Sequence, residues 1–167
     1  MKISIHGVDD ALRHVKRCSG VEEKVKELLR RVETIGVDMA SVRFENAQYD
    51  GDPEVEVWAE WTRETTLRIH ADGFDVGFIE FGTGVHYKEA HPEAAAWGAK
   101  RGSYGHGLGK LDSWRYRGSP GTNGEIIQDG PHAGMIKTHG NPPARAMYDT
   151  GKELRGRILD IAREVFG

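Results

Sequence analysis

The chain has 167 residues, of which 38% are hydrophobic and 29% charged, and its formal net charge is -3. That length suits one compact domain with a buried core, and the charge argues against a dedicated nucleic-acid-binding protein, which is usually basic. A single cysteine, Cys18, excludes a disulfide framework within the chain and a zinc site built from cysteines. Neither the apolar core of a signal peptide nor a run of about 18 apolar residues is present, so we expect a soluble protein made in a reducing compartment.

The first predicted elements are a short strand at residues 2–6 and an amphipathic helix after Ser19. Ser19 and Glu22 have the spacing of a capping box, in which each side chain accepts a backbone hydrogen bond at the start of a helix. Apolar residues then recur at steps of three and four, namely Val21, Val25, Leu28, Val32 and Ile35. This spacing predicts a helix of about five turns with one stripe facing the core.

Four runs that alternate with a period of two follow the helix, at residues 41–48, 54–61, 65–71 and 74–81. Asp-Gly pairs lie in two of the connections, and such pairs are typical of tight hairpin turns. The runs therefore predict an antiparallel four-stranded meander. The last run is apolar on both faces, as in a central strand or a strand covered on both sides.

Residues 82–140 hold 13 of the 22 glycines and 5 of the 8 histidines, without a sustained apolar period. We expect a long Gly/His-rich loop over 84–140, because ordinary connections are far shorter. After it, Asn141 can cap a helix whose first turn contains Pro142 and Pro143, with an apolar stripe at Met147, Leu154, Ile158, Ile161 and Val165. The predicted fold is α+β: a single domain over 1–167, with the meander covered by the two helices.

Nothing in the sequence predicts an enzyme. The loop histidines lack the spacing of a zinc protease, and His91-Pro-Glu93 matches only the first part of a zinc deaminase signature whose cysteines one Cys cannot supply. The glycines at 102–109 lack the spacing of a phosphate-binding loop, and no serine lies in a nucleophile elbow. We expect no catalytic residue, no cofactor and no metal ligand, with the loop histidines simply solvated.

The segment between Trp97 and Arg117 combines cations with aromatic residues, against one acid, Asp112. Its members are Trp97, Lys100, Arg101, Tyr104, Lys110, Trp114, Arg115, Tyr116 and Arg117. Cations neutralise phosphates and aromatic rings stack on bases, so the segment could contact DNA. The same residue types are enriched at protein interfaces, and a protein contact is favoured. Both contacts stay open.

Two segments carry a family resemblance. Phe78-Ile-Glu-Phe-Gly-Thr-Gly84 ends the last predicted strand, and Asn141-Pro-Pro-Ala-Arg-Ala-Met-Tyr148 opens the final helix. With the opening at residues 3–12, they resemble the tail-completion or head–tail joining proteins of long-tailed bacteriophages. The likeness covers roughly 1–84 and 140–167, and the loop over 84–140 is longer than the common family pattern.

The resemblance implies a structural virion protein without an active site. Family members form a ring, usually six-fold, between the head connector and the tail, which requires two different patches on each subunit. The implied partners are other copies of the chain, the connector and tail proteins, and the DNA that passes through the channel. The implied location is the virion, after synthesis in the cytoplasm of a bacterial host. The residues expected to form the family motif and subunit interface are Glu80, Phe81, Gly82, Thr83, Gly84, Pro142 and Pro143.

Overall fold

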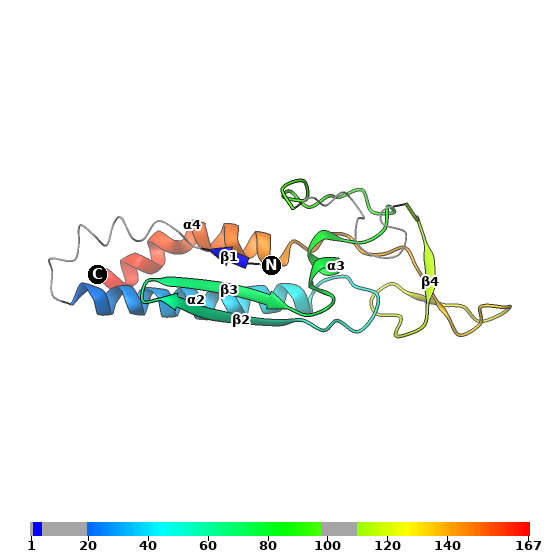
Figure 1. Ribbon diagram of the computed structural model, residues 1–167, viewed down its shortest axis with the longest axis horizontal. Helices are drawn as coiled ribbons and strands as arrows, with labels where there is room; N and C mark the ends of the chain where they lie inside the picture. Colours follow the sequence, from blue (N-terminus) through cyan, green and yellow to red (C-terminus); the bar gives the residue numbers. More distant parts are fainter. Residues whose placement is uncertain (1, 5–19, 98–109) are drawn as a thin grey trace. The chain divides into compact units, whose positions relative to one another are not determined.

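A computed structural model describes residues 2–4, 20–97 and 110–167 and confirms the α+β class (Figure 1). The described residues form two compact units. The first contains 2–4, 20–42, 56–72 and 147–167, and the second contains 43–55, 73–97 and 110–146. Within these residues, no helix combines the length and apolar character that crossing a membrane requires.

The first long helix, α2 (Val21–Glu45), confirms the predicted amphipathic helix and extends it by ten residues beyond Ile35. Ser19, its predicted cap, lies outside the described residues. Its buried apolar residues lie at helical spacing: Val25, Leu28, Leu29, Val32, Ala40 and Phe44. The prediction of a strand at 41–48 is wrong. Gly36, Ala40 and Phe44 continue the buried stripe of the helix at steps of four. Residues 41–45 belong to the helix.

A three-stranded antiparallel sheet with the order β1-β3-β2 lies in the first unit. Its strands are β1 (Lys2–Ser4), β2 (Glu56–Arg63) and β3 (Thr66–Asp72), which confirms three of the predicted strands in their described parts. In the hairpin, Ala59 lies opposite Ile69. The inner side of β3 buries Leu67, Ile69 and Ala71, as the alternation predicted.

The C-terminal helix, α4 (Ala146–Phe166), packs in the same unit and buries Met147, Leu154, Ile161 and Val165. It confirms the second predicted helix. Gly36 marks the close approach of α2 to its neighbours, since a Cβ there would lie 2.2 Å from Cδ1 of Ile69 and 3.0 Å from Cδ1 of Leu154. One glycine of α2 therefore contacts both the sheet and α4.

The run predicted as the fourth strand is a short helix, α3 (Val76–Phe81), in the second unit. The prediction was wrong because a six-residue apolar run does not reveal its period. Its buried residues, Val76, Ile79 and Glu80, lie at steps of three and four. The four-stranded meander is thus replaced by a β2-β3 hairpin to which β1 adds the third strand.

A second three-stranded antiparallel sheet, with the order β4-β6-β5, lies within the segment that was predicted to be a loop. Its strands are β4 (Trp114–Tyr116), β5 (Glu125–Ile126) and β6 (Ile136–Thr138). Strands of two or three residues are too short to display a period in the sequence. The long loop is therefore partly a sheet.

Candidate functional site

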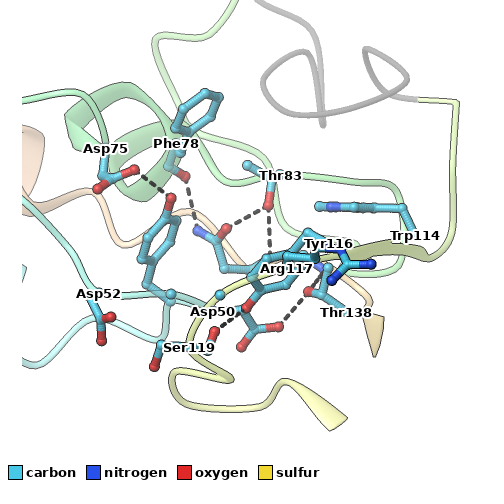
Figure 2. A pocket seen from close by; sticks show the side chains of 15 residues that line it. Asp50, Asp52, Asp75, Phe78, Thr83, Trp114, Tyr116, Arg117, Ser119 and Thr138 are labelled. Atoms are coloured by element: carbon cyan, nitrogen blue, oxygen red, sulfur yellow. Dashed lines mark hydrogen bonds between the residues drawn. The ribbon is translucent and has the colours of Figure 1, made fainter. Parts of the chain in front are cut away.

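The two segments that carry the family resemblance meet in the second unit (Figure 2). The Thr83 amide donates to the Asn141 carbonyl at 3.0 Å, and the Asn141 amide donates to Thr83 Oγ1 at 3.1 Å. The Thr83 hydroxyl donates in turn to Asn141 Oδ1 at 2.6 Å. Both residues are buried. The two segments are therefore joined by hydrogen bonds.

Residues 141–145 also complete the C-terminal end of α3. The last carbonyls of a helix have no partner within the helix. Asn141 Nδ2 donates to the Phe78 carbonyl at 2.9 Å, and the amides of Ala144 and Arg145 donate to the carbonyls of Ile79 and Glu80 at 2.9 and 3.3 Å. Proline has no N–H, so the donors come from the residues on either side of the Pro-Pro pair.

These bonds correct the predicted role of Asn141. It does not cap α4, which begins five residues later at Ala146, and Pro142 and Pro143 precede that helix. Gly82, with φ +77°, allows the close approach, because a Cβ there would lie 2.8 Å from the Pro143 nitrogen. A side chain at this position would therefore push the two segments apart.

The motif glutamate is paired inside the chain. Glu80 Oε1 lies 3.0 Å from His91 Nε2, and both side chains are fully buried. The prediction that the loop histidines are solvated is therefore wrong for His91. The Glu93 amide donates to His91 Nδ1 at 3.1 Å, which requires that Nδ1 carries no proton. The neutral ring therefore donates from Nε2 to Glu80. Phe81 packs against the same ring, with centroids 4.5 Å apart.

The remaining motif residues also pack within the second unit. Gly82, Thr83 and Gly84 are buried, and Phe81, Pro142 and Pro143 are half-buried. Their expected role at a subunit interface stays a prediction. Their role within the chain is structural, since they join α3 to the segment before α4.

A pocket of about 380 Å³ lies beside this junction (Figure 2). Its lining comes from residues within 49–52, 75–83, 114–119 and 138–141. Asp50 accepts from the hydroxyl of Thr138 and from the amide of Asn123 at 2.8 Å. Hydrogen bonds thus already occupy both oxygens of this carboxylate.

A second carboxylate of the pocket, Asp75, is engaged in the same way. It accepts from the Tyr49 hydroxyl at 2.6 Å and from the Glu54 amide at 3.1 Å. Burial, together with the adjacent Asp75 carboxylate, raises the pKa of Tyr49 well above its ordinary value. Burial also raises the pKa of Tyr116, with smaller contributions from Asp50 and Asp52. The phenols are therefore hydrogen-bond donors rather than acid–base groups at neutral pH.

The basic and aromatic residues predicted at 97–117 lie in several environments. Trp114 and Tyr116 alternate with Arg115 along β4, and the two aromatic residues line the pocket. Arg115 is exposed and lies opposite Lys137 in the sheet. Within β4, Arg115 and the two rings thus lie on opposite sides of the strand.

The other members of that segment are placed as follows. Arg117 lines the pocket. Trp97 is 52% exposed and lies near Phe81, with ring centroids 6.4 Å apart. Lys110 is exposed. Lys100, Arg101 and Tyr104 lie outside the described residues.

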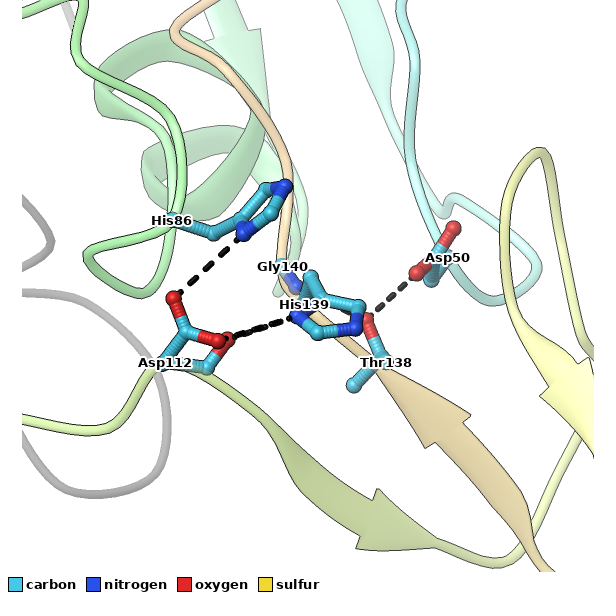
Figure 3. A network of polar contacts seen from close by, with 6 residues as sticks. All are labelled: Asp50, His86, Asp112, Thr138, His139 and Gly140. Carbon is cyan, nitrogen blue, oxygen red and sulfur yellow. Dashed lines mark hydrogen bonds and ion pairs between the residues drawn. The ribbon is translucent and has the colours of Figure 1, made fainter.

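One group of side chains was missed by the sequence analysis. Figure 3 shows His86, Asp112 and His139 close together, with potential ligand atoms all within 4.8 Å of one another. The residues are far apart in the sequence and match no spacing pattern. A signal was nevertheless present, since His86 follows the first motif segment and His139 precedes the second.

The described site thus contains two carboxylates that accept hydrogen bonds (Asp50 and Asp75), two neutral phenols (Tyr49 and Tyr116) and one group of potential metal ligands. In comparisons with family models, with curated proteins and with solved structures, the chain matches none.

Proposed function

We propose that this protein is a structural subunit of a tailed bacteriophage or prophage virion, which completes or joins the head–tail connection as a member of a ring. The observation that carries the proposal is the contact between Thr83 and Asn141. The two segments on which the resemblance depends lie 58 residues apart, yet fold as one unit. If the two segments matched the family pattern only by chance, there would be no reason for them to contact each other in the fold.

Two of the three carboxylates that line the pocket, Asp50 and Asp75, are held in hydrogen bonds within the chain, which supports a binding role. Asp50 and Asp75 each accept two hydrogen bonds, and the motif carboxylate of Glu80 is paired with His91. A general acid or base needs a group that can exchange a proton with a substrate. These carboxylates instead hold the second unit together, as a subunit of a rigid ring would need.

Exposed apolar side chains supply surfaces for neighbouring subunits. In the first unit Leu159 is 66% exposed, and Trp58 lies on the outer side of β2. In the second unit Phe74 is 80% exposed. A closed ring needs two different patches on each subunit, and large apolar side chains are the residues that such patches bury. We assign these side chains to contacts between copies of the chain.

The proposal is tested by deleting the gene from the parent phage and supplying variants in trans. The wild-type gene restores the plaque titre, whereas Phe74→Ser lowers it at least tenfold without changing the circular dichroism spectrum. Gln128→Ala, a change of an exposed residue in the same unit, is the matched control and restores full titre. A deletion phage with undiminished titre contradicts the proposal and leaves DNA binding by Arg115 and Arg117 as the function to examine.

A further inference from the structure

We propose that His86, Asp112 and His139 form a site for a divalent transition-metal ion, with Zn²⁺ as the best match. The three residues come from three separate segments of the second unit, and both histidines face the Asp112 carboxylate (Figure 3). Imidazole nitrogens and a carboxylate oxygen are ligands that Zn²⁺ takes in proteins. This site is independent of the proposed virion role.

The distances between the groups fit a shared ion. His86 Nδ1 lies 3.3 Å from Asp112 Oδ1, and His139 Nδ1 lies 3.4 Å from Asp112 Oδ2. Ligand atoms about 2.0–2.2 Å from a tetrahedral ion are separated by roughly 3.4 Å. Direct charge-assisted hydrogen bonds are shorter, at about 2.7–2.9 Å. Both distances are therefore compatible with a shared ion, although each histidine faces a different oxygen of Asp112.

One hydrogen bond of His139 competes with metal binding and must break when the ion binds. His139 Nδ1 also lies 3.0 Å from the backbone carbonyl of Asp112, and a protonated Nδ1 donates a hydrogen bond there. A metal ion needs the nitrogen lone pair, so the proton moves to the other ring nitrogen or to solvent. Both histidines thus lie within hydrogen-bonding distance of Asp112 in the structure.

Backbone contacts beside each ligand hold the three segments in place. The Val85 amide donates to the Leu111 carbonyl at 3.2 Å, directly before His86 and Asp112 in the chain. A Cβ on Gly84 would lie 2.9 Å from the carbonyl of His139. The positions of the ligands therefore depend on the junction of the two motif segments rather than on free loops.

The site is accessible and leaves coordination positions open. The Asp112 side chain is 66% exposed, and those of His86 and His139 are 47% and 33% exposed. Three protein ligands with water in the remaining position form an open zinc site. A bound ion would join the two ends of the 84–140 segment to its middle, because His86, His139 and Asp112 lie at those points of the sequence.

The test uses the full chain, stripped with a chelator, and titration calorimetry with ZnCl₂. We expect one ion per chain. His86→Ala, His139→Ala and Asp112→Ala each weaken binding at least about tenfold, the smallest effect expected when a ligand is removed, and the double histidine variant abolishes it. Asp112→Asn keeps the shape of the side chain and removes its charge, so it weakens binding even if Asp112→Ala misfolds.

His132→Ala is the matched control, because His132 is an exposed histidine of the same unit outside the group. It leaves the affinity unchanged. Co²⁺ provides a second readout, since a tetrahedral site with nitrogen and oxygen ligands gives a visible absorption band that the double histidine variant lacks. Absence of Zn²⁺ binding by the wild-type chain, or wild-type affinity in the double variant, overturns the proposal.

Discussion

Thr83 and Asn141 exchange three hydrogen bonds across 58 residues of sequence, and Asn141 also reaches the Phe78 carbonyl of α3. One asparagine therefore fixes the end of a helix and the return of the chain towards α4. The pocket and the group of potential metal ligands both lie beside this contact. We expect the order of the whole second unit to depend on it.

Asn141→Ala tests this dependence. The variant leaves the buried Thr83 hydroxyl without the Asn141 Oδ1 acceptor, and an unsatisfied buried polar group costs about 1–3 kcal/mol. Urea unfolding followed by fluorescence should show a loss of that size. Gln128→Ala, at an exposed position of the same unit, should change the free energy of unfolding by less than about 0.5 kcal/mol. Equal stability of the two variants would contradict the structural role of Asn141.

The buried pair of Glu80 and His91 gives a second prediction. Glu80→Ala leaves the His91 Nε2–H without this acceptor, which costs about 1–3 kcal/mol, and the cavity adds to the loss. Glu80→Gln should be clearly milder, because its amide oxygen still accepts from the neutral ring. The exposed Glu89→Ala is the control in denaturant unfolding. Were Glu80→Gln as damaging as Glu80→Ala, the assigned histidine tautomer would be wrong.

Alkaline pH should destabilise the second unit through Tyr49. The pKa of Tyr49 in the folded chain lies above the value of about 10 in the unfolded chain. The unfolded state therefore loses its proton first, so this contribution to stability is fully present below pH 10 and falls as the pH rises further. Denaturant unfolding between pH 8 and 11 should show this fall, with a smaller slope in Tyr49→Phe. Identical slopes would contradict the assignment.

Two helical glycines should respond in opposite ways. Gly156 lies in α4 with no atom within 4 Å of an added Cβ, so Gly156→Ala should stabilise the chain by about 0.5–1 kcal/mol. Gly36 lies against Ile69 and Leu154, so Gly36→Val should destabilise it by about 1–3 kcal/mol through overpacking. Thermal or urea unfolding measures both. A stabilised Gly36→Val variant would rule out the packing described for α2.

The parts of the fold that follow from local spacing were predictable. The apolar steps of three and four identified α2 and α4, and the alternation around Leu67 and Ile69 identified the β2-β3 hairpin. The run at 76–81 is too short to distinguish a buried helix from a buried strand. The strands β4 to β6 are shorter still, so contacts in the folded chain rather than local propensity define them.

The candidate site was predictable only in its parts. The sequence marked the two motif segments but assigned Asn141 to the following helix, whereas its side chain completes the preceding one. That choice depends on a contact over 58 residues, which spacing does not contain. His86, Asp112 and His139 were overlooked for the same reason, since their convergence follows from the junction of the two segments.

The most direct test of the central claim is electron microscopy of lysates from the parent phage with this gene deleted. The proposed function predicts DNA-filled heads beside separate, finished tails, and joined particles when the gene is supplied in trans. Normal, joined virions in the deletion lysate would contradict it.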